Sequence, residues 1–158
     1  MAKPQKGSYI LLVGLDTEKS IFIGSLGYII FPEAYYAYVG SAMNGLSARL
    51  ARHLRAEKKL HWHIDYLLKK SEIDEIIICQ SEERLECYLA QALAGTFTAI
   101  PDFGSSDCKC RSHLFFANEK SRLKVKVAEA VSQIGLICEV FSRPFNIDRI
   151  SDRTFSDS

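Results

Sequence analysis

The N-terminal part of the chain alternates between short apolar runs and polar or glycine breaks, which is the pattern of strands. Runs rich in β-branched and aromatic residues cover residues 8–15, 20–23, 27–31 and 35–39, and Gly, Asp and Pro separate them. Neighbouring runs of this kind pair most simply as antiparallel hairpins. The pattern therefore predicts that the chain begins with a small antiparallel sheet.

After Gly45 the apolar positions change to helical spacing. Leu46, Leu50 and Leu54 recur every four residues, which predicts an amphipathic helix over residues 46–57. Further along, the pattern predicts helices over 63–70, 82–94 (capped by Ser81) and 119–133, strands over 75–79, 113–117 and 136–141, and a loop over 101–111. We expect an α+β fold in which a small antiparallel β-sheet is flanked by helices, with a helix and a strand as a C-terminal extension.

The length of 158 residues is that of a single domain, and we find no internal repeat. We expect residues 1–117 to form the main domain and residues 118–150 to add a helix and a strand packed on it. Residues 151–158 are polar, and we expect a flexible tail there.

Composition places the chain among ordinary globular proteins. Hydrophobic residues make up 47% and charged residues 25%, which excludes a disordered, collagen-like or coiled-coil chain. The apolar runs are far shorter than the roughly 20 residues of a membrane-spanning helix. Five cysteines without a secretory context predict free thiols, and therefore a cytoplasmic protein with no membrane partner.

The net charge of +1 conceals an uneven distribution along the chain. Residues 49–59 carry five bases and one acid, residues 71–107 carry eight acids and one base, and residues 109–126 carry six bases and one acid. Basic segments of this kind can bind the phosphates of nucleic acid, although a solvated surface is the more common explanation.

Five residues stand at positions where their side chains can carry chemistry. Arg49 and His53 are one turn apart at the edge of the apolar stripe of their predicted helix. Glu86 lies at the rim of the apolar face of the next long helix, where a carboxylate can hold Mg²⁺. Tyr9 and Tyr38 lie on the first and last strands of the N-terminal set. A structural ion pair, a surface carboxylate and core aromatic rings are the alternative interpretations.

The order of these residues resembles the motifs of the GIY-YIG nuclease superfamily: Gly7-Ser8-Tyr9, Tyr38-Val39-Gly40, then Arg49, His53 and Glu86. Longer stretches resemble its Uri-type branch of stand-alone predicted endonucleases, namely residues 23–27 (IGSLG), 36–42 (YAYVGSA), 49–54 (RLARHL), 60–67 (LHWHIDYL) and 103–114 (FGSSDCKCRSHL). The resemblance covers about residues 7–116. The segment between Tyr9 and Tyr38 is longer than in most relatives and leaves room for an extra hairpin.

The resemblance implies a divalent-metal-dependent endonuclease that hydrolyses phosphodiester bonds, in DNA rather than RNA. In that interpretation Glu86 carries Mg²⁺ or Mn²⁺, Tyr9 takes a proton from the attacking water, and Arg49 neutralises charge on the phosphate. Tyr38 and His53 orient the water or the phosphate. The flanking phosphates would be bound by Arg52, Arg55, Lys58, Lys59, His61 and His63.

Two alternatives follow from other features of the sequence. The superfamily usually has an Asn after the glutamate helix, and this chain has none between Glu86 and Phe116, which favours a binding module without catalysis. The second alternative is an interaction domain stabilised by zinc. Thiol, imidazole and carboxylate groups that could bind the ion are present at His61, His63, Asp65, Cys108, Cys110 and His113, although the Cys-x-Cys spacing is tighter than the usual spacing of zinc ligands. Trp62 either stacks on an unpaired base or anchors the core.

Overall fold

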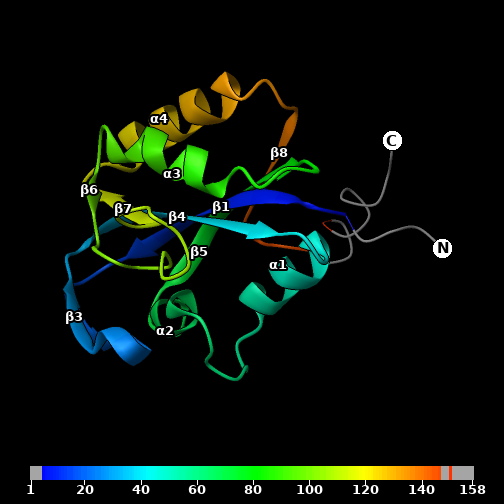
Figure 1. Ribbon diagram of the computed structural model, residues 1–158. Coiled ribbons are helices and arrows are strands. Elements are labelled where there is room, and N and C mark those ends of the chain that lie inside the picture. Colours follow the sequence, from blue (N-terminus) through cyan, green and yellow to red (C-terminus); the bar gives the residue numbers. More distant parts are fainter. Residues whose placement is uncertain (1–4, 147–149, 151–158) are drawn as a thin grey trace.

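The computed structural model describes residues 5–146 and residue 150. Its centre is a six-stranded antiparallel sheet with the order β6-β7-β4-β1-β5-β8 (Figure 1). The strands are β1 (Gly7–Leu15), β4 (Ala34–Ala42), β5 (Glu72–Gln80), β6 (Thr98–Ala99), β7 (Leu114–Ala117) and β8 (Cys138–Ser142). The predicted α+β class is confirmed; the tail predicted over residues 151–158 lies outside the described residues.

Helices cover both faces of this sheet, and the alternation of side chains along β1 explains why. Tyr9, Leu11 and Val13 face α1 (Leu46–Leu54) and α2 (His63–Leu68). Ile10 and Leu12 face α3 (Glu86–Ala94) and α4 (Lys120–Gln133) on the other side. Because β1 is apolar on both faces, it lies in the middle of the sheet, between the two helical layers (Figure 1).

The N-terminal strands pair differently from the simplest hairpin order. β2 (Lys19–Phe22) and β3 (Tyr28–Phe31) form a separate two-stranded ribbon with a short 3₁₀ turn, Gly24–Leu26, between them. β1 bypasses this ribbon and pairs with β4 and β5. Each ribbon strand is exposed on one face, so the ribbon is unsuited to the interior of the sheet, which β1 occupies instead. The ribbon is the extra hairpin for which the sequence left room.

Two predicted helix ends differ from the observed ones by three or four residues, and side-chain hydrogen bonds explain both. The first helix ends at Leu54 rather than at residue 57, because Lys58 Nζ donates to the backbone carbonyls of Arg52 and His53 and closes the last turn. The helix predicted over 82–94 begins at Glu86. Ser81 Oγ accepts a hydrogen bond from the backbone N–H of Glu83 in a preceding turn, so Ser81 is not the N-cap.

The expectation that all five cysteines are free is wrong for two of them. Cys79 and Cys138 are directly opposite each other in the β5–β8 pair and form a disulfide, with 4.5 Å between their Cα atoms. The other three, Cys87, Cys108 and Cys110, are free thiols. Pairing of β5 with β8 joins segments separated by 59 residues, and the sequence carries no local signal for it.

None of the helices in the described part of the chain has the length and the apolar character needed to cross a membrane.

Candidate functional site

Four of the predicted catalytic residues, Tyr9, Tyr38, Arg49 and His53, lie together where α1 packs on the sheet; we call them the tyrosine cluster. Tyr9 on β1 is opposite Gly40 on β4, and Tyr38 is two residues earlier on β4. A Cβ atom at position 40 would lie 2.5 Å from Cζ of Tyr9. Gly40 therefore allows the Tyr9 ring to lie directly against the neighbouring strand.

A hydrogen bond joins the helix to the sheet inside this cluster. Tyr9 Oη lies 2.7 Å from Nε2 of His53, and both side chains are buried. Tyr38 completes the aromatic packing, with its ring 6.4 Å from the His53 ring. In the described part of the chain, Nδ1 of His53 is buried without a hydrogen-bond partner. The burial of these side chains determines which of them carry a charge.

Burial keeps both members of the Tyr9–His53 pair neutral. It is the main reason why the pKa of His53 is lowered to about 3, and the positive charges of Lys58 and Arg49 contribute to this shift. Burial also raises the pKa of Tyr9 to about 12, although the nearby Arg49 opposes this shift. Of two neutral groups the phenol is the stronger acid, so the Tyr9 hydroxyl donates to Nε2 of His53. The pKa of Tyr38 is raised for the same main reason, its burial.

Arg49 lies between the tyrosines and the indole of Trp62. Its Nη1 donates to the backbone carbonyl of Ser41 at 3.0 Å, and its Cζ atom lies 4.2 Å from the centre of the Trp62 ring. Arg52 lies over the same ring at 4.3 Å. Both contacts have cation–π geometry. Trp62 thus packs beneath two arginines and against the core, which fits the core-anchoring interpretation better than the base-stacking one.

A buried carboxylate fixes the second arginine. Both oxygens of Asp65 accept hydrogen bonds from Arg52 at 2.8 Å, and Oδ2 also accepts from the backbone N–H groups of His61 and Trp62 at 2.9 Å. Burial alone would raise the pKa of Asp65, but these hydrogen bonds outweigh it and lower the pKa. The carboxylate therefore stays ionised and ties α1 to the start of α2.

The six residues predicted to bind nucleic acid divide into two groups. Arg55, Lys59 and His61 have exposed side chains near the end of α1. The other three take part in internal contacts. Arg52 is paired with Asp65, and Lys58 donates to the last carbonyls of α1. His63 Nδ1 accepts a hydrogen bond from the backbone N–H of Gly104 at 2.9 Å.

Glu86, the predicted metal ligand, is the first residue of α3, on the other side of the sheet from α1. Its negative charge raises the pKa of both Tyr9 and Tyr38, so it lies within electrostatic range of them. Its contacts are with other residues: Oε2 lies 3.7 Å from Nδ1 of His113, and Oε1 lies 3.5 Å from Nη1 of Arg84. The Glu86 side chain is 19% exposed.

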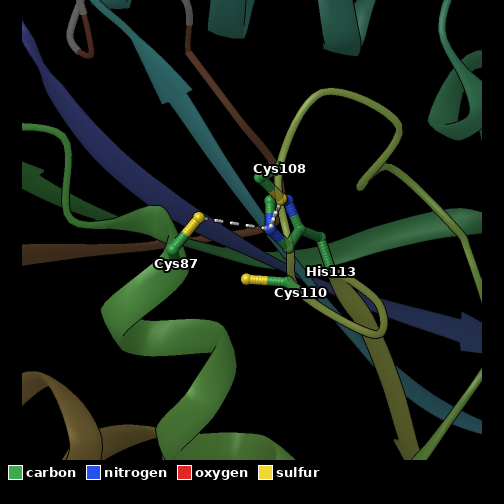
Figure 2. Close-up of side chains that lie close together, drawn as sticks. All are labelled: Cys87, Cys108, Cys110 and His113. Atoms are coloured by element: carbon green, nitrogen blue, oxygen red, sulfur yellow. Dashed lines mark hydrogen bonds between the residues drawn. The ribbon is translucent and has the colours of Figure 1, made fainter.

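Beside Glu86 the structure gathers Cys87, Cys108, Cys110 and His113, which we call the cysteine–histidine cluster (Figure 2). Their sulfur and nitrogen ligand atoms all lie within 4.8 Å of one another, and this group could hold a metal ion. Nε2 of His113 is 3.4 Å from Sγ of Cys108 and 3.9 Å from Sγ of Cys87. Burial, together with smaller contributions from Cys110 and Cys108, raises the pKa of Cys87 to about 12.

This cluster corrects the zinc site predicted from the sequence. Cys108, Cys110 and His113 belong to it. Asp65 instead accepts hydrogen bonds from Arg52, and His63 accepts one from the backbone of Gly104. His61 has its backbone bonded to Asp65 and its side chain exposed. Sequence reasoning missed Cys87, which comes from the first turn of α3. The sequence signal for Cys87 is a thiol next to Glu86, at the end of the helix that lies nearest to the loop with Cys108 and Cys110.

One loop connects the two clusters. Residues 101–113 carry three of the four cluster residues, and two backbone hydrogen bonds close the loop, from Asp102 to Arg111 and from His113 to Phe103, each at 2.8 Å. Gly104 in this loop has φ +70°, and a Cβ there would lie 3.1 Å from Tyr38 and 3.4 Å from His113. The loop therefore packs against the tyrosine cluster at Gly104 and carries three residues of the cysteine–histidine cluster.

Comparison with family models gives a match over residues 8–136, to a domain described only as a domain of unknown function, DUF123. No curated protein and no solved structure matches the chain. The match covers β1 to α4, and thus both clusters and the loop between them.

Proposed function

This chain belongs to the DUF123 family, and we propose that it is a divalent-metal-dependent endonuclease of the GIY-YIG type, which hydrolyses phosphodiester bonds in nucleic acid, DNA in preference to RNA. One observation carries the proposal. Tyr9, Tyr38, Arg49 and His53 come from two strands and a helix, yet their side chains converge at one point, with the carboxylate of Glu86 within electrostatic range. This is the residue set that the sequence resemblance requires.

The burial of each residue indicates its part in the proposed reaction. Arg49 and Glu86 remain partly exposed, so they are the groups that can meet a phosphate. Arg49 would neutralise the charge that develops on the phosphate. Tyr9 is 1% exposed and bonded to His53, so we assign these two as positioning residues that hold α1, and with it Arg49, against the sheet.

The pKa of Tyr9 limits its role as a general base. With a pKa of about 12, ionising Tyr9 at neutral pH costs about 7 kcal/mol, and the neutral His53 does not lower that cost. Tyr9 would act as a base only when additional positive charge lies nearby. In its resting state it serves as a hydrogen-bonding phenol.

The two candidate metal sites differ in chemistry. The carboxylate of Glu86 suits Mg²⁺ or Mn²⁺, which bind through one or two carboxylates and substrate phosphate. Such an ion would supply positive charge to a phosphate oxygen and lower the pKa of a bound water. The thiols of the cysteine–histidine cluster do not suit these hard ions.

The test is a cleavage assay on single-stranded, duplex and branched DNA and on RNA, with Mg²⁺, with Mn²⁺ and with a chelator. We expect metal-dependent cleavage of DNA, reduced at least about 100-fold by Arg49→Lys and by Glu86→Gln. Glu83→Gln and Arg122→Lys are the matched controls, because both side chains are exposed and lie outside the tyrosine cluster. Undiminished cleavage by either active-site variant would refute the assignment.

A second candidate, a nucleic-acid-binding module without catalysis, is favoured by the burial of both phenols and by the missing Asn. The same substrates distinguish it. Binding that weakens steeply with salt, without cleavage under any metal condition, would replace the nuclease by this module. Arg55→Ala and Lys59→Ala would then reduce the slope of the salt dependence.

A further inference from the structure

We propose that Cys87, Cys108, Cys110 and His113 bind a structural Zn²⁺ ion that fastens the first turn of α3 to the loop over residues 101–113. This site adjoins the proposed nuclease site, because Glu86 lies beside both, but the inference does not depend on the nuclease proposal. Three thiols and one imidazole are the Cys₃His set of closed, four-coordinate zinc sites. Four protein ligands leave no position open for a substrate, so the ion would be structural rather than catalytic.

The spacing of the ligand atoms fits a single ion. A zinc ion takes sulfur at about 2.3 Å and nitrogen at about 2.0–2.1 Å, which in a tetrahedron places neighbouring ligand atoms somewhat less than 4 Å apart. The four ligand atoms already lie within 4.8 Å of one another, and His113 Nε2 lies 3.4 Å from Cys108 Sγ. Small side-chain movements therefore close the coordination shell.

The orientation of His113 is the second, independent observation. The residue is 2% exposed, and its Nε2 atom points at the sulfurs (Figure 2). Its Nδ1 atom is buried without a hydrogen-bond partner in the described part of the chain, and Oε2 of Glu86 lies 3.7 Å from it, just beyond hydrogen-bond distance. A ring that offers one nitrogen to a metal and the other to a carboxylate is the arrangement that zinc-bound histidines adopt. A small movement of the Glu86 side chain would complete this arrangement, and Glu86 would then be a positioning residue for His113 in this site.

The chemistry of the donors selects the ion. Thiolates favour soft and borderline metals such as zinc over Mg²⁺, Ca²⁺ or Mn²⁺. The three sulfurs are free thiols, whereas the remaining two cysteines form the disulfide between β5 and β8. Zinc would bring three thiols together at one point, whereas a disulfide would pair two of them and leave the third.

The proposed ion also has a structural purpose. Its ligands come from a helix and from a loop without regular structure, and the loop is closed by few backbone hydrogen bonds. The same loop places Gly104 against Tyr38. A zinc ion would therefore hold this loop, and with it Gly104, in place against Tyr38.

The first test measures the metal in the full-length protein, purified with added ZnCl₂ and then dialysed. We expect about one zinc per chain and, by X-ray absorption at the zinc edge of the unaltered protein, a shell of three sulfurs and one nitrogen. Three results would each overturn the proposal: no retained zinc, a coordination shell dominated by oxygen, or a disulfide between two of Cys87, Cys108 and Cys110.

Variants locate the site. Cys110→Ser and Cys87→Ser should each lose most of the bound zinc, whereas the double variant Cys79→Ser/Cys138→Ser, the control, removes both disulfide cysteines outside the cluster and should keep it. If a serine variant does not fold, the thiol count of the unaltered protein answers the same question. Ellman's reagent should find three more reactive thiols after treatment with a zinc chelator than before, and no increase would contradict zinc ligation.

The role of Glu86 has its own measurement. Glu86→Gln should still bind zinc but with an affinity about 10–100-fold lower, as loss of a histidine-orienting carboxylate does in other zinc sites. Competition with a chromophoric chelator measures this, and Glu83→Gln is the control. An unchanged affinity in Glu86→Gln would remove Glu86 from the zinc site. Because this readout is binding, it is separate from any loss of cleavage.

Discussion

The tyrosine cluster and the cysteine–histidine cluster both contact the loop over residues 101–113, but they differ in how their polar side chains are paired. In the tyrosine cluster the groups bond to one another or to backbone, as Tyr9 does to His53 and Arg49 to Ser41. In the cysteine–histidine cluster four ligand atoms face each other. The first arrangement is held together by protein atoms, although Nδ1 of His53 has no partner among the described residues, whereas the second would be completed by the proposed ion. The two regions should therefore respond differently to metal removal, mutation and acid.

The largest expected difference is the response to a zinc chelator. Structural zinc contributes about 10–16 kcal/mol of binding free energy in small zinc domains, so its removal should lower the thermal midpoint and expose the loop over residues 101–113. Hydrogen exchange should accelerate in this loop and in the first turn of α3, whereas α1 and β1 keep their protection. Equal acceleration throughout the domain would show that the two regions are not independent.

The next largest effect concerns the ion pair that ties α1 to α2. Asp65→Asn leaves the Arg52 guanidinium without its buried carboxylate, and we expect the free energy of unfolding to fall by about 3–5 kcal/mol. Denaturant titration measures this, with Glu57→Gln, an exposed acid in the following loop, as the control. Zinc content should not change. A loss below about 1 kcal/mol would mean that the pair is no more important than a surface salt bridge.

The contrast between the regions also explains what the sequence could predict. β1, β4 and α1 carry clear periodicity, so Tyr9, Tyr38, Arg49 and His53 could be placed on strands and a helix face before their contacts were known. Their convergence follows from regular geometry: neighbouring strands bring together opposite residues, and helix residues one turn apart share a face.

The parts that were missed depend on contacts between distant segments. Cys87 joins Cys110 and His113 only because α3 starts beside the loop, and Cys79 meets Cys138 only through the β5–β8 pairing. Likewise Asp65, which the sequence offered as a zinc ligand, is bound by Arg52 from the preceding helix. Residue type identified these groups as chemically capable, but tertiary packing decided their partners.

Acid should destabilise the tyrosine cluster through His53. Its pKa is about 3 in the folded protein and 6.5 in its ordinary state. As the pH falls below 6.5, the unfolded chain binds a proton that the folded chain does not, so stability decreases towards pH 3. By pH 4 the loss should be about 3 kcal/mol.

Denaturant titrations between pH 7 and pH 4 measure this loss. In His53→Gln, which keeps a hydrogen-bonding group but does not titrate, the pH dependence should be weaker by about that amount. His61→Gln, at an exposed position, should follow the unaltered protein. If His53→Gln shows the same acid sensitivity as the unaltered protein, the acid response arises elsewhere.

The smallest expected effect tests the close contact between strands beneath the tyrosine cluster. A methyl group at position 40 would meet the Tyr9 ring at 2.5 Å, so Gly40→Ala must displace the ring and weaken its bond to His53. We expect a loss of about 1–3 kcal/mol and a change in the fluorescence of Trp62, whose ring packs beside His53. Gly95→Ala is the matched control, because the nearest atom to its Cβ is 3.8 Å away. Since the cysteine–histidine cluster does not include Gly40, zinc affinity should be the same in both variants. A reduced zinc affinity in Gly40→Ala alone would show that the tyrosine ring and the metal ligands are coupled through the loop.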